Sequence, residues 1–329
     1  MFNTLTEREA AARIAALRKV DIVMHASPDS DTLGCALAVS TVINANGGDA
    51  ELVCSDPIPE YLHYILGDTP IHHELRADAE RISVDVASPG QLGRFADAAG
   101  TISMMIDHHG RGEVFADNTV EADAAACGEI IHRIIKLLER EHGMKIPQKT
   151  YDYIYTAISG DTGSFRFANT TAETHRIAAE LHELGADTVK IAHELHAVKT
   201  RGELAARMLG LANMKFYCRD RLAITSATLE EQQEHGVGAG DFSEADEMRS
   251  VFGIWVGVSL REFEPGVWKV STRANVDIDC SAVCGIYGGG GHKGAAGCTL
   301  RGTDRDGAIS MLTDAFGRAI EEYEKRSGK

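Results

Sequence analysis

Short apolar runs alternate with longer amphipathic stretches through roughly the first two hundred residues, and this alternation limits the fold more than any other feature. The runs at 21–24, 50–54, 81–86 and 101–107 have the length and composition of buried strands. The stretches 33–46 and 127–142 have helical periodicity. Strands that alternate with helices predict βαβ units, and therefore an α/β fold with a mostly parallel sheet flanked by helices.

The pattern changes near residue 215. Two strand-like runs, 253–260 and 267–271, flank a Glu-Pro-Gly turn, which is typical of a β-hairpin, and residues 306–324 have the pattern of an amphipathic helix. We therefore expect two domains joined by a helical linker. The first covers residues 1–195, the linker 196–215, and a smaller α/β domain with antiparallel strands 216–329.

The charge and the cysteines narrow the class of protein. The formal net charge is −16, from 33 basic and 49 acidic residues. Such a chain is a poor partner for long duplex nucleic acid, although a small anionic ligand remains compatible with it. Seven scattered cysteines with no C-x-x-C pair indicate reduced thiols. The N-terminus has no apolar signal core and no run reaches membrane-spanning length, so we expect a cytoplasmic protein without a membrane partner. The sequence is also compatible with a homodimer.

Carboxylates and histidines gather where the apolar runs end. They are His25, Asp29, Asp31, Asp85, Asp107, His108 and Asp161. Because the carboxyl ends of parallel strands meet at one edge of a sheet, we expect these side chains to converge there. Each one alone is equally well explained as a helix cap or a turn residue.

Their number favours a metal site over caps and turns. Four carboxylates at one edge repel one another unless cations compensate them. Together with His25 and His108 they are too many ligands for one ion and about enough for two. Oxygen and imidazole nitrogen suit Mn²⁺, Mg²⁺, Fe²⁺ or Zn²⁺. The sequence therefore predicts a dinuclear metal site.

The order and spacing of these motifs resemble the DHH phosphoesterases. The matching segments are 25–31, 83–85, Asp107-His108-His109 and 160–163. A glycine-rich segment, 288–297, is similar to the signature of the DHH-associated nucleic-acid-binding domain. The length and the two-domain arrangement most resemble the NrnA-type members. These combine cleavage of very short RNA with a phosphatase activity on 3′-phosphoadenosine 5′-phosphate (pAp).

The resemblance implies a role for each matching residue. His25 and Asp29 would bind one metal, Asp31, His108 and Asp161 the other, and Asp85 would bridge both and serve catalysis. The family usually uses Mn²⁺, with Mg²⁺, Co²⁺ or Fe²⁺ as alternatives. His109 would face the substrate phosphate as a second catalytic residue, and Asp107 would orient a histidine. Substrate would also be bound by Arg273, Gly289, Gly290, Gly291 and His292. Ala274 stands where the family commonly has Ser, and Val86 where a polar residue is frequent.

The resemblance further implies what the protein does. It implies Mn²⁺-dependent hydrolysis, by water activated between two metal ions, of short RNA oligonucleotides to mononucleotides and of pAp to AMP. The motifs equally allow a phosphodiesterase for cyclic di-AMP or linear dinucleotides. A pyrophosphatase or exopolyphosphatase shares the N-terminal motifs, but the glycine-rich signature favours nucleotides. An inactive nucleotide-binding protein would be expected to have lost a metal ligand, and all six are present.

Overall fold

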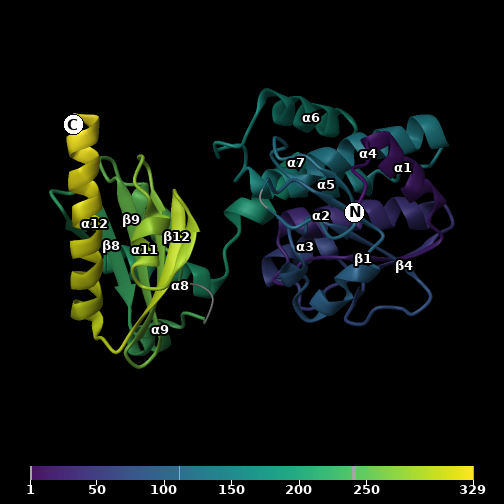
Figure 1. Cartoon of the computed structure of the whole chain (residues 1–329). Coiled ribbons are helices and arrows are strands. Elements are labelled where there is room, and N and C mark those ends of the chain that lie inside the picture. Colours follow the sequence, from purple (N-terminus) through teal and green to yellow (C-terminus); the bar gives the residue numbers. More distant parts are fainter. Residues whose placement is uncertain (1, 111, 239–241, 329) are drawn as a thin grey trace. The chain divides into compact units, whose positions relative to one another are not determined.

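The computed structural model describes residues 2–110, 112–238 and 242–328. The chain divides into two units, Met1–Val198 and Lys199–Lys329, and each unit has a sheet of its own (Figure 1). The helix that follows the boundary, α8 (Arg201–Ala212), belongs to the second unit, where the Thr225 hydroxyl donates a 2.7 Å hydrogen bond to the carbonyl of Gly210.

A parallel sheet forms the centre of the N-terminal unit, as the alternation predicts. Its strands lie in the order β3-β2-β1-β4-β5-β6, and every pair between them is parallel. Their bounds are β1 Lys19–Val23, β2 Asp49–Val53, β3 Ile71–His72, β4 Glu80–Val84, β5 Met104–Asp107 and β6 Asp117–Val120. The edge strands β3 and β6 were not predicted, because β3 has two residues and β6 begins with polar ones. The run at 101–107 becomes a strand only from Met104, since residues up to Thr101 are helical.

Helices cover both faces of this sheet. Their bounds are α1 Glu7–Ala16, α2 Ser30–Ala45, η1 Glu60–Leu62, α3 His63–Leu66, η2 Pro89–Thr101, α4 Cys127–His142, α5 Lys149–Asp161, α6 Ala172–Glu183, α7 Thr188–Ala192 and η3 His193–Ala197. Small residues let α2, α4 and α5 approach closely. A Cβ atom on Gly34 would lie 2.5 Å from the carbonyl oxygen of Tyr153, and one on Gly128 would lie 2.8 Å from the Cβ of Ala157. This close packing brings the ends of the three helices together.

The C-terminal unit is built on a mixed sheet in the order β11-β12-β10-β9-β8-β7. Only the pair β8–β9 is parallel among the strand pairs of the described residues; the other pairs are antiparallel. The strands are β7 Lys215–Tyr217, β8 Leu222–Ala227, β9 Val256–Glu264, β10 Val267–Ala274, β11 Gly290–His292 and β12 Ala295–Arg301. The predicted hairpin is the pair β9–β10.

Helices cover the two faces of the second sheet unequally. They are α9 Leu229–His235, α10 Ala245–Arg249, α11 Cys280–Gly285 and α12 Arg305–Ser327, together with α8. The long helix α12, which the sequence predicts, packs its apolar side on one face, where Phe316 joins Trp268 and Leu300 in the core (Figure 1). On the other face, α8 and α10 pack against β8 and β9.

Two further properties of the chain follow from the structure. All seven cysteines lie within the described residues and carry free thiols. Among the helices of the described part of the chain, none combines the length and apolar character needed to cross a membrane.

Candidate metal centre

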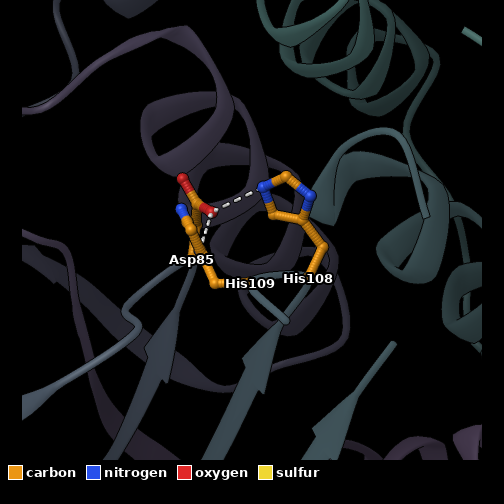
Figure 2. Close-up of side chains that lie close together, drawn as sticks. All are labelled: Asp85, His108 and His109. Atoms are coloured by element: carbon orange, nitrogen blue, oxygen red, sulfur yellow. Dashed lines mark ion pairs between the residues drawn. The ribbon is translucent and has the colours of Figure 1, made fainter. Parts of the chain in front are cut away.

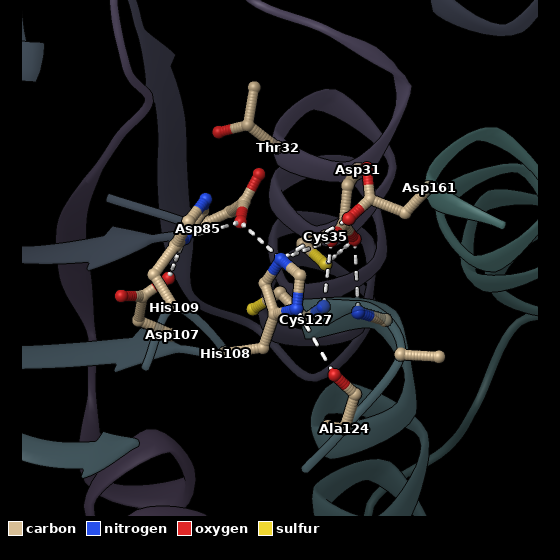
Figure 3. A network of polar contacts seen from close by, with 12 residues as sticks. Asp31, Thr32, Cys35, Asp85, Asp107, His108, His109, Ala124, Cys127 and Asp161 are labelled. Carbon is tan, nitrogen blue, oxygen red and sulfur yellow. Dashed lines mark hydrogen bonds and ion pairs between the residues drawn. The ribbon is translucent and has the colours of Figure 1, made fainter. Parts of the chain in front are cut away.

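The candidate site lies where three adjacent strands of the parallel sheet end. His25 follows β1, Asp85 follows β4, and Asp107 ends β5 with His108 directly after it. Two helices supply the other carboxylates: α2 carries Asp29 and Asp31 at its N-terminus, and α5 ends at Asp161. Figure 3 shows Asp31, Asp85, His108 and Asp161 converging from four of these elements.

Asp29 is the N-cap residue of α2. Its Oδ1 accepts hydrogen bonds from the backbone amides of Asp31 (2.9 Å) and Thr32 (3.1 Å). The helix begins at Ser30, so residues 30–32 already form its first turn. The cap fixes the Asp29 carboxylate with Oδ1 at 3.6 Å from Nε2 of His25.

Asp31 is fully buried, and the N-terminus of α4 holds its carboxylate. Oδ2 accepts from the amide of Cys127 at 2.7 Å, and Oδ1 accepts from the amide of Gly128 at 3.0 Å (Figure 3). These amides favour the anion. Burial nevertheless raises the pKa of Asp31 well above its ordinary value, and the carboxylates of Asp85 and Asp161 raise it further. Helix amides alone therefore do not compensate the charge collected here.

Asp85 lies between two histidine-containing groups and faces both. Its Oδ2 is 3.6 Å from Nε2 of His25. Its Oδ1 is 3.5 Å from Nε2 of His108 and 3.6 Å from Nδ1 of His109 (Figure 2). The backbone of Asp85 has a φ of 56°, which is uncommon for a residue other than glycine. Burial raises the pKa of this carboxyl group, and Oδ1 is a buried oxygen without a hydrogen-bond partner among the described residues.

Backbone carbonyls set the orientation of the His25 and His108 rings. Nδ1 of His25 lies 2.8 Å from the carbonyl oxygen of Ala26, and Nδ1 of His108 lies 3.2 Å from that of Ala124. Nε2 of each ring therefore points to the carboxylates, and for His108 it lies 3.2 Å from Oδ2 of Asp161.

The carboxylates also control the charge of these rings. Burial alone would lower the pKa of His25, but hydrogen bonding to Asp29 and Asp85 raises it to about 11. Burial opposes the charge on His108 as well, and the neighbouring carboxylates, Asp161 first, raise its pKa to about 10. The site thus attracts positive charge at both histidine positions.

The residues fit two divalent cations. One group consists of His25, Asp29 and Asp85, the other of Asp31, His108 and Asp161, and the potential ligand atoms of each group lie within 4.8 Å of one another. Two ligands at about 2.1 Å from one ion lie about 3.0–3.4 Å apart, close to the separations found here. The donors are those that Mn²⁺, Mg²⁺ and Fe²⁺ prefer, and Oδ1 of Asp85, a buried oxygen without a hydrogen-bond partner among the described residues, is available to a cation.

His109 lies beside this cluster and is oriented by Asp107. Its Nδ1 is 2.7 Å from Oδ1 of Asp107, a carboxylate that is almost fully buried (Figure 3). This hydrogen bond raises the pKa of His109. The His109 side chain is 40% exposed, which leaves its ring accessible to a ligand. The histidine that Asp107 contacts is thus His109, not His108.

Sequence analysis missed a residue that connects two parts of the site. The amide of Asn169 donates to the carbonyl of Ala125 (2.9 Å) and to that of Asp161 (3.0 Å). Ala125 follows Ala124, the residue that orients His108. Asn169 therefore links the backbone of one candidate ligand to the segment that fixes another. Nothing in its local sequence distinguishes it from an ordinary loop asparagine.

The remaining predicted site residues lie in the C-terminal unit. Arg273, at the end of β10, and the loop Gly288–Gly291 line one hollow of about 770 Å³. Nε of Arg273 lies 3.3 Å from Oδ2 of Asp246. His292 is exposed at the end of β11 and is not among the residues that line this hollow.

The three glycines that were predicted to bind substrate differ in how far packing requires a glycine at each position. A Cβ on Gly289 would lie 2.2 Å from the carbonyl oxygen of Gly297, and one on Gly291, with a φ of 138°, would lie 2.7 Å from that of Ala295. Packing against β12 alone requires glycine at both positions. A Cβ on Gly290 would meet no atom within 4 Å. Packing within the fold therefore does not explain why position 290 is a glycine.

Comparison with known proteins agrees with the two-unit structure. The DHH family, N-terminal domain, matches residues 19–158, and the DHHA1 domain matches residues 222–322. The bifunctional oligoribonuclease and PAP phosphatase NrnA of Thermus thermophilus is 32% identical over 305 residues, which are 89% of this chain and 88% of that protein. The chain belongs to the DHH family of phosphoesterases.

Further matches show how far the similarity extends. The Bacillus subtilis protein of the same name is 24% identical over 88% of this chain and 91% of its own length. The cyclic-di-AMP phosphodiesterase GdpP of B. subtilis is 24% identical over 92% of this chain, which corresponds to 48% of GdpP. An exopolyphosphatase-related protein from Bacteroides fragilis has the same fold, with a TM-score of 0.85, 23% identity and 98% of each chain covered.

Proposed function

We propose that this DHH phosphoesterase is an Mn²⁺-dependent enzyme that hydrolyses very short RNA oligonucleotides to mononucleotides and pAp to AMP. Two relatives that match nearly all of the chain are named as bifunctional oligoribonucleases and PAP phosphatases. The catalytic part corresponds to residues 1–195, followed by a helical linker, 196–215, and a nucleotide-binding part, 216–329.

The observation that carries the proposal is the position of Asp85. Its two carboxylate oxygens face two separate groups, one with His25 and Asp29 and one with His108, Asp31 and Asp161. A single buried carboxylate between two such groups is suited to bridge two ions. When bound, two divalent cations supply positive charge for phosphate oxygens and make water acidic enough to attack at neutral pH.

The side chains around this pair of groups perform the remaining tasks. The α4 amides at Cys127 and Gly128 hold the Asp31 carboxylate in one orientation, so that it does not rearrange when a substrate binds. Asp107 holds the ring of His109, whose exposed part is available to a phosphate oxygen. In the C-terminal unit, Arg273 offers a guanidinium, His292 an exposed ring and Gly290 an open backbone to a nucleotide.

The test is hydrolysis by the purified chain with Mn²⁺. A dinucleotide, a five-nucleotide RNA, pAp, cyclic di-AMP and pyrophosphate would be compared side by side. We expect fastest turnover of the dinucleotide or of pAp, and loss of all turnover in Asp85→Asn. Asp117→Asn makes the same chemical change at the amino end of β6, away from the cluster, and should retain activity. Equal activity in Asp85→Asn and the parent would refute the proposal.

A second substrate has a specific observation in its favour. Cyclic-di-AMP phosphodiesterases from B. subtilis and Listeria monocytogenes match more than nine-tenths of this chain, at 24% and 25% identity. This chain covers 48% of the length of each of these two proteins. Preference for cyclic di-AMP in the panel would move the assignment to second-messenger turnover and leave the proposed metal ligands unchanged.

A further inference from the structure

The loop between His25 and Asp29 has an unusual backbone. Both residues are candidate ligands of one ion, and three residues separate them, Ala26, Ser27 and Pro28. Ser27 has a φ of 52°, a left-handed conformation that serine seldom adopts and that a following proline disfavours further. Ser27 is also exposed, so packing around its side chain does not hold this conformation. Contacts with other parts of the chain are therefore needed to stabilise the loop.

The first such contact comes from Asp56, in the segment that follows β2, a neighbour of β1 in the sheet. Oδ2 of Asp56 accepts hydrogen bonds from the amide (3.0 Å) and from the hydroxyl (3.3 Å) of Ser27. Oδ1 accepts a hydrogen bond of 2.9 Å from the hydroxyl of Ser55, which fixes the carboxylate itself. Asp56 thus holds the residue that has the unusual backbone.

The second contact comes from Gln91, in η2. Its carbonyl accepts a hydrogen bond of 2.6 Å from the amide of Ala26, and its Oε1 accepts one of 2.6 Å from the amide of Ala87. Ala87 lies two residues after Asp85, whose φ of 56° is also left-handed. Gln91 therefore connects the loop after β1 to the loop after β4. These two loops carry ligands of the same candidate ion.

The two contacts engage both backbone donors between the ligands. Pro28 has no N–H group, so these donors are the amides of Ala26 and Ser27. Water could satisfy both amides on this partly exposed loop, so the hydrogen bonds are not needed to avoid buried unpaired groups. Their effect is to fix the course of the backbone, and with it the positions of the ligands on either side.

The two supporting segments also meet beside the loop. A Cβ on Gly93, in η2, would clash with Oγ of Ser55 and would lie 3.1 Å from the Cβ of Ala26. Segment 55–56 and η2 therefore pack against the loop and against each other. Three stretches that are distant in the sequence fix one short piece of backbone.

We propose that Asp56 and Gln91 are positioning residues for the ion bound by His25, Asp29 and Asp85, which we call the His25 group. Each acts through the backbone and not as a ligand. Together they keep the three donors at the separations that the ion needs, so that little rearrangement is required when it binds. This inference rests on the proposed function, since it presupposes that the group binds a divalent ion.

Calorimetric titration of the metal-free, full-length protein with Mn²⁺ tests this role without catalysis. Asp56→Ala and Gln91→Ala should each bind one of two ions about 10–100-fold more weakly, as is typical when the partner that orients a ligand is removed. Two conservative variants keep the acceptor oxygen: Asp56→Asn removes a negative charge, and Gln91→Glu adds one. Both should restore the parental affinity for both ions. Weaker binding by Asp56→Asn together with tighter binding by Gln91→Glu would show attraction by charge and would overturn the proposal.

Two backgrounds identify the ion that is affected. Asp161→Asn removes a ligand of the other group and leaves one ion, bound by the His25 group. Asp29→Asn does the reverse. Adding Asp56→Ala should weaken binding of the remaining ion about 10–100-fold in the first background and leave it unchanged in the second. Equal losses in both backgrounds would indicate a general effect on the fold and would overturn the proposal.

Asp117→Ala is the matched control. Oδ1 of Asp117 also accepts a hydrogen bond from a distant backbone amide, that of Asn3 at 2.8 Å, but at the amino end of β6. This variant should lose stability in urea unfolding with EDTA, as Asp56→Ala does, and keep both Mn²⁺ affinities. Two ions bound by Asp56→Ala and Gln91→Ala as tightly as by the parent would overturn the inference and leave the proposed function intact. A parent that binds no Mn²⁺ would overturn both.

Discussion

Replacing Asn169 by alanine should weaken metal binding at the group that contains Asp31, His108 and Asp161. The side chain makes two hydrogen bonds to backbone carbonyls, at 2.9 and 3.0 Å. Each is worth about 0.5–1.5 kcal/mol net, so the free energy of unfolding should fall by roughly 1–3 kcal/mol. Because one bond holds Asp161 and the other the segment that orients His108, we expect affinity for one Mn²⁺ to fall about 10–100-fold.

Calorimetric titration with Mn²⁺ measures the affinity of each site, and chemical unfolding in EDTA measures the stability. Asn275→Ala is the matched control, since the Asn275 amide donates to two backbone carbonyls, of Arg249 (2.6 Å) and Ile254 (3.1 Å), in the C-terminal unit. It should lose similar stability and keep both Mn²⁺ affinities. The reasoning is refuted if Asn169→Ala loses stability but binds two Mn²⁺ ions as tightly as the parent does.

Three further variants test separate parts of the structure. Asp85→Asn removes a buried carboxylate whose pKa is raised, so in urea unfolding without metal the variant should be about 1–3 kcal/mol more stable than the parent. Mn²⁺ should no longer raise the Tm of this variant. Burial raises the pKa of Glu244 to about 7 from 4.5, so the free energy of unfolding of the parent should fall as the pH rises from 4.5 to 7. Glu244→Gln should have the same free energy of unfolding as the parent near pH 4 and a value higher by up to about 3 kcal/mol at pH 8. Parallel pH profiles of the two proteins would contradict this. Gly289→Ala should lose about 1–3 kcal/mol through the clash with Gly297, whereas Gly290→Ala should keep its stability and lose affinity for AMP, measured by titration.

Much of the N-terminal fold follows from local sequence patterns. Apolar runs identify β1, β2, β4 and β5, and a helical period gives α4 its observed ends, Cys127 and His142. The edge strand β6 escapes this reasoning, because its residues 117–120 are mostly polar, although they pair with β5 in the structure. The same limit applies to β3, whose two residues carry no pattern.

The candidate ligands were found from sequence because they stand at ends of elements whose type is encoded locally. A parallel sheet brings strand ends to one edge whatever the loops between them do, so His25, Asp85 and His108 had to meet. The roles of these residues as ligands stay predictions until metal binding is measured.

Tertiary packing decided which groups hold the candidate ligands in place. The α4 amides reach Asp31 because Gly34 and Gly128 let three helices approach. Asn169, which follows Ala125 by 44 residues in the sequence, joins Ala125 to Asp161. A sequence by itself determines which side chains an element carries and on which of its sides. Contacts between elements depend on the distances and register of packing, which no local pattern contains.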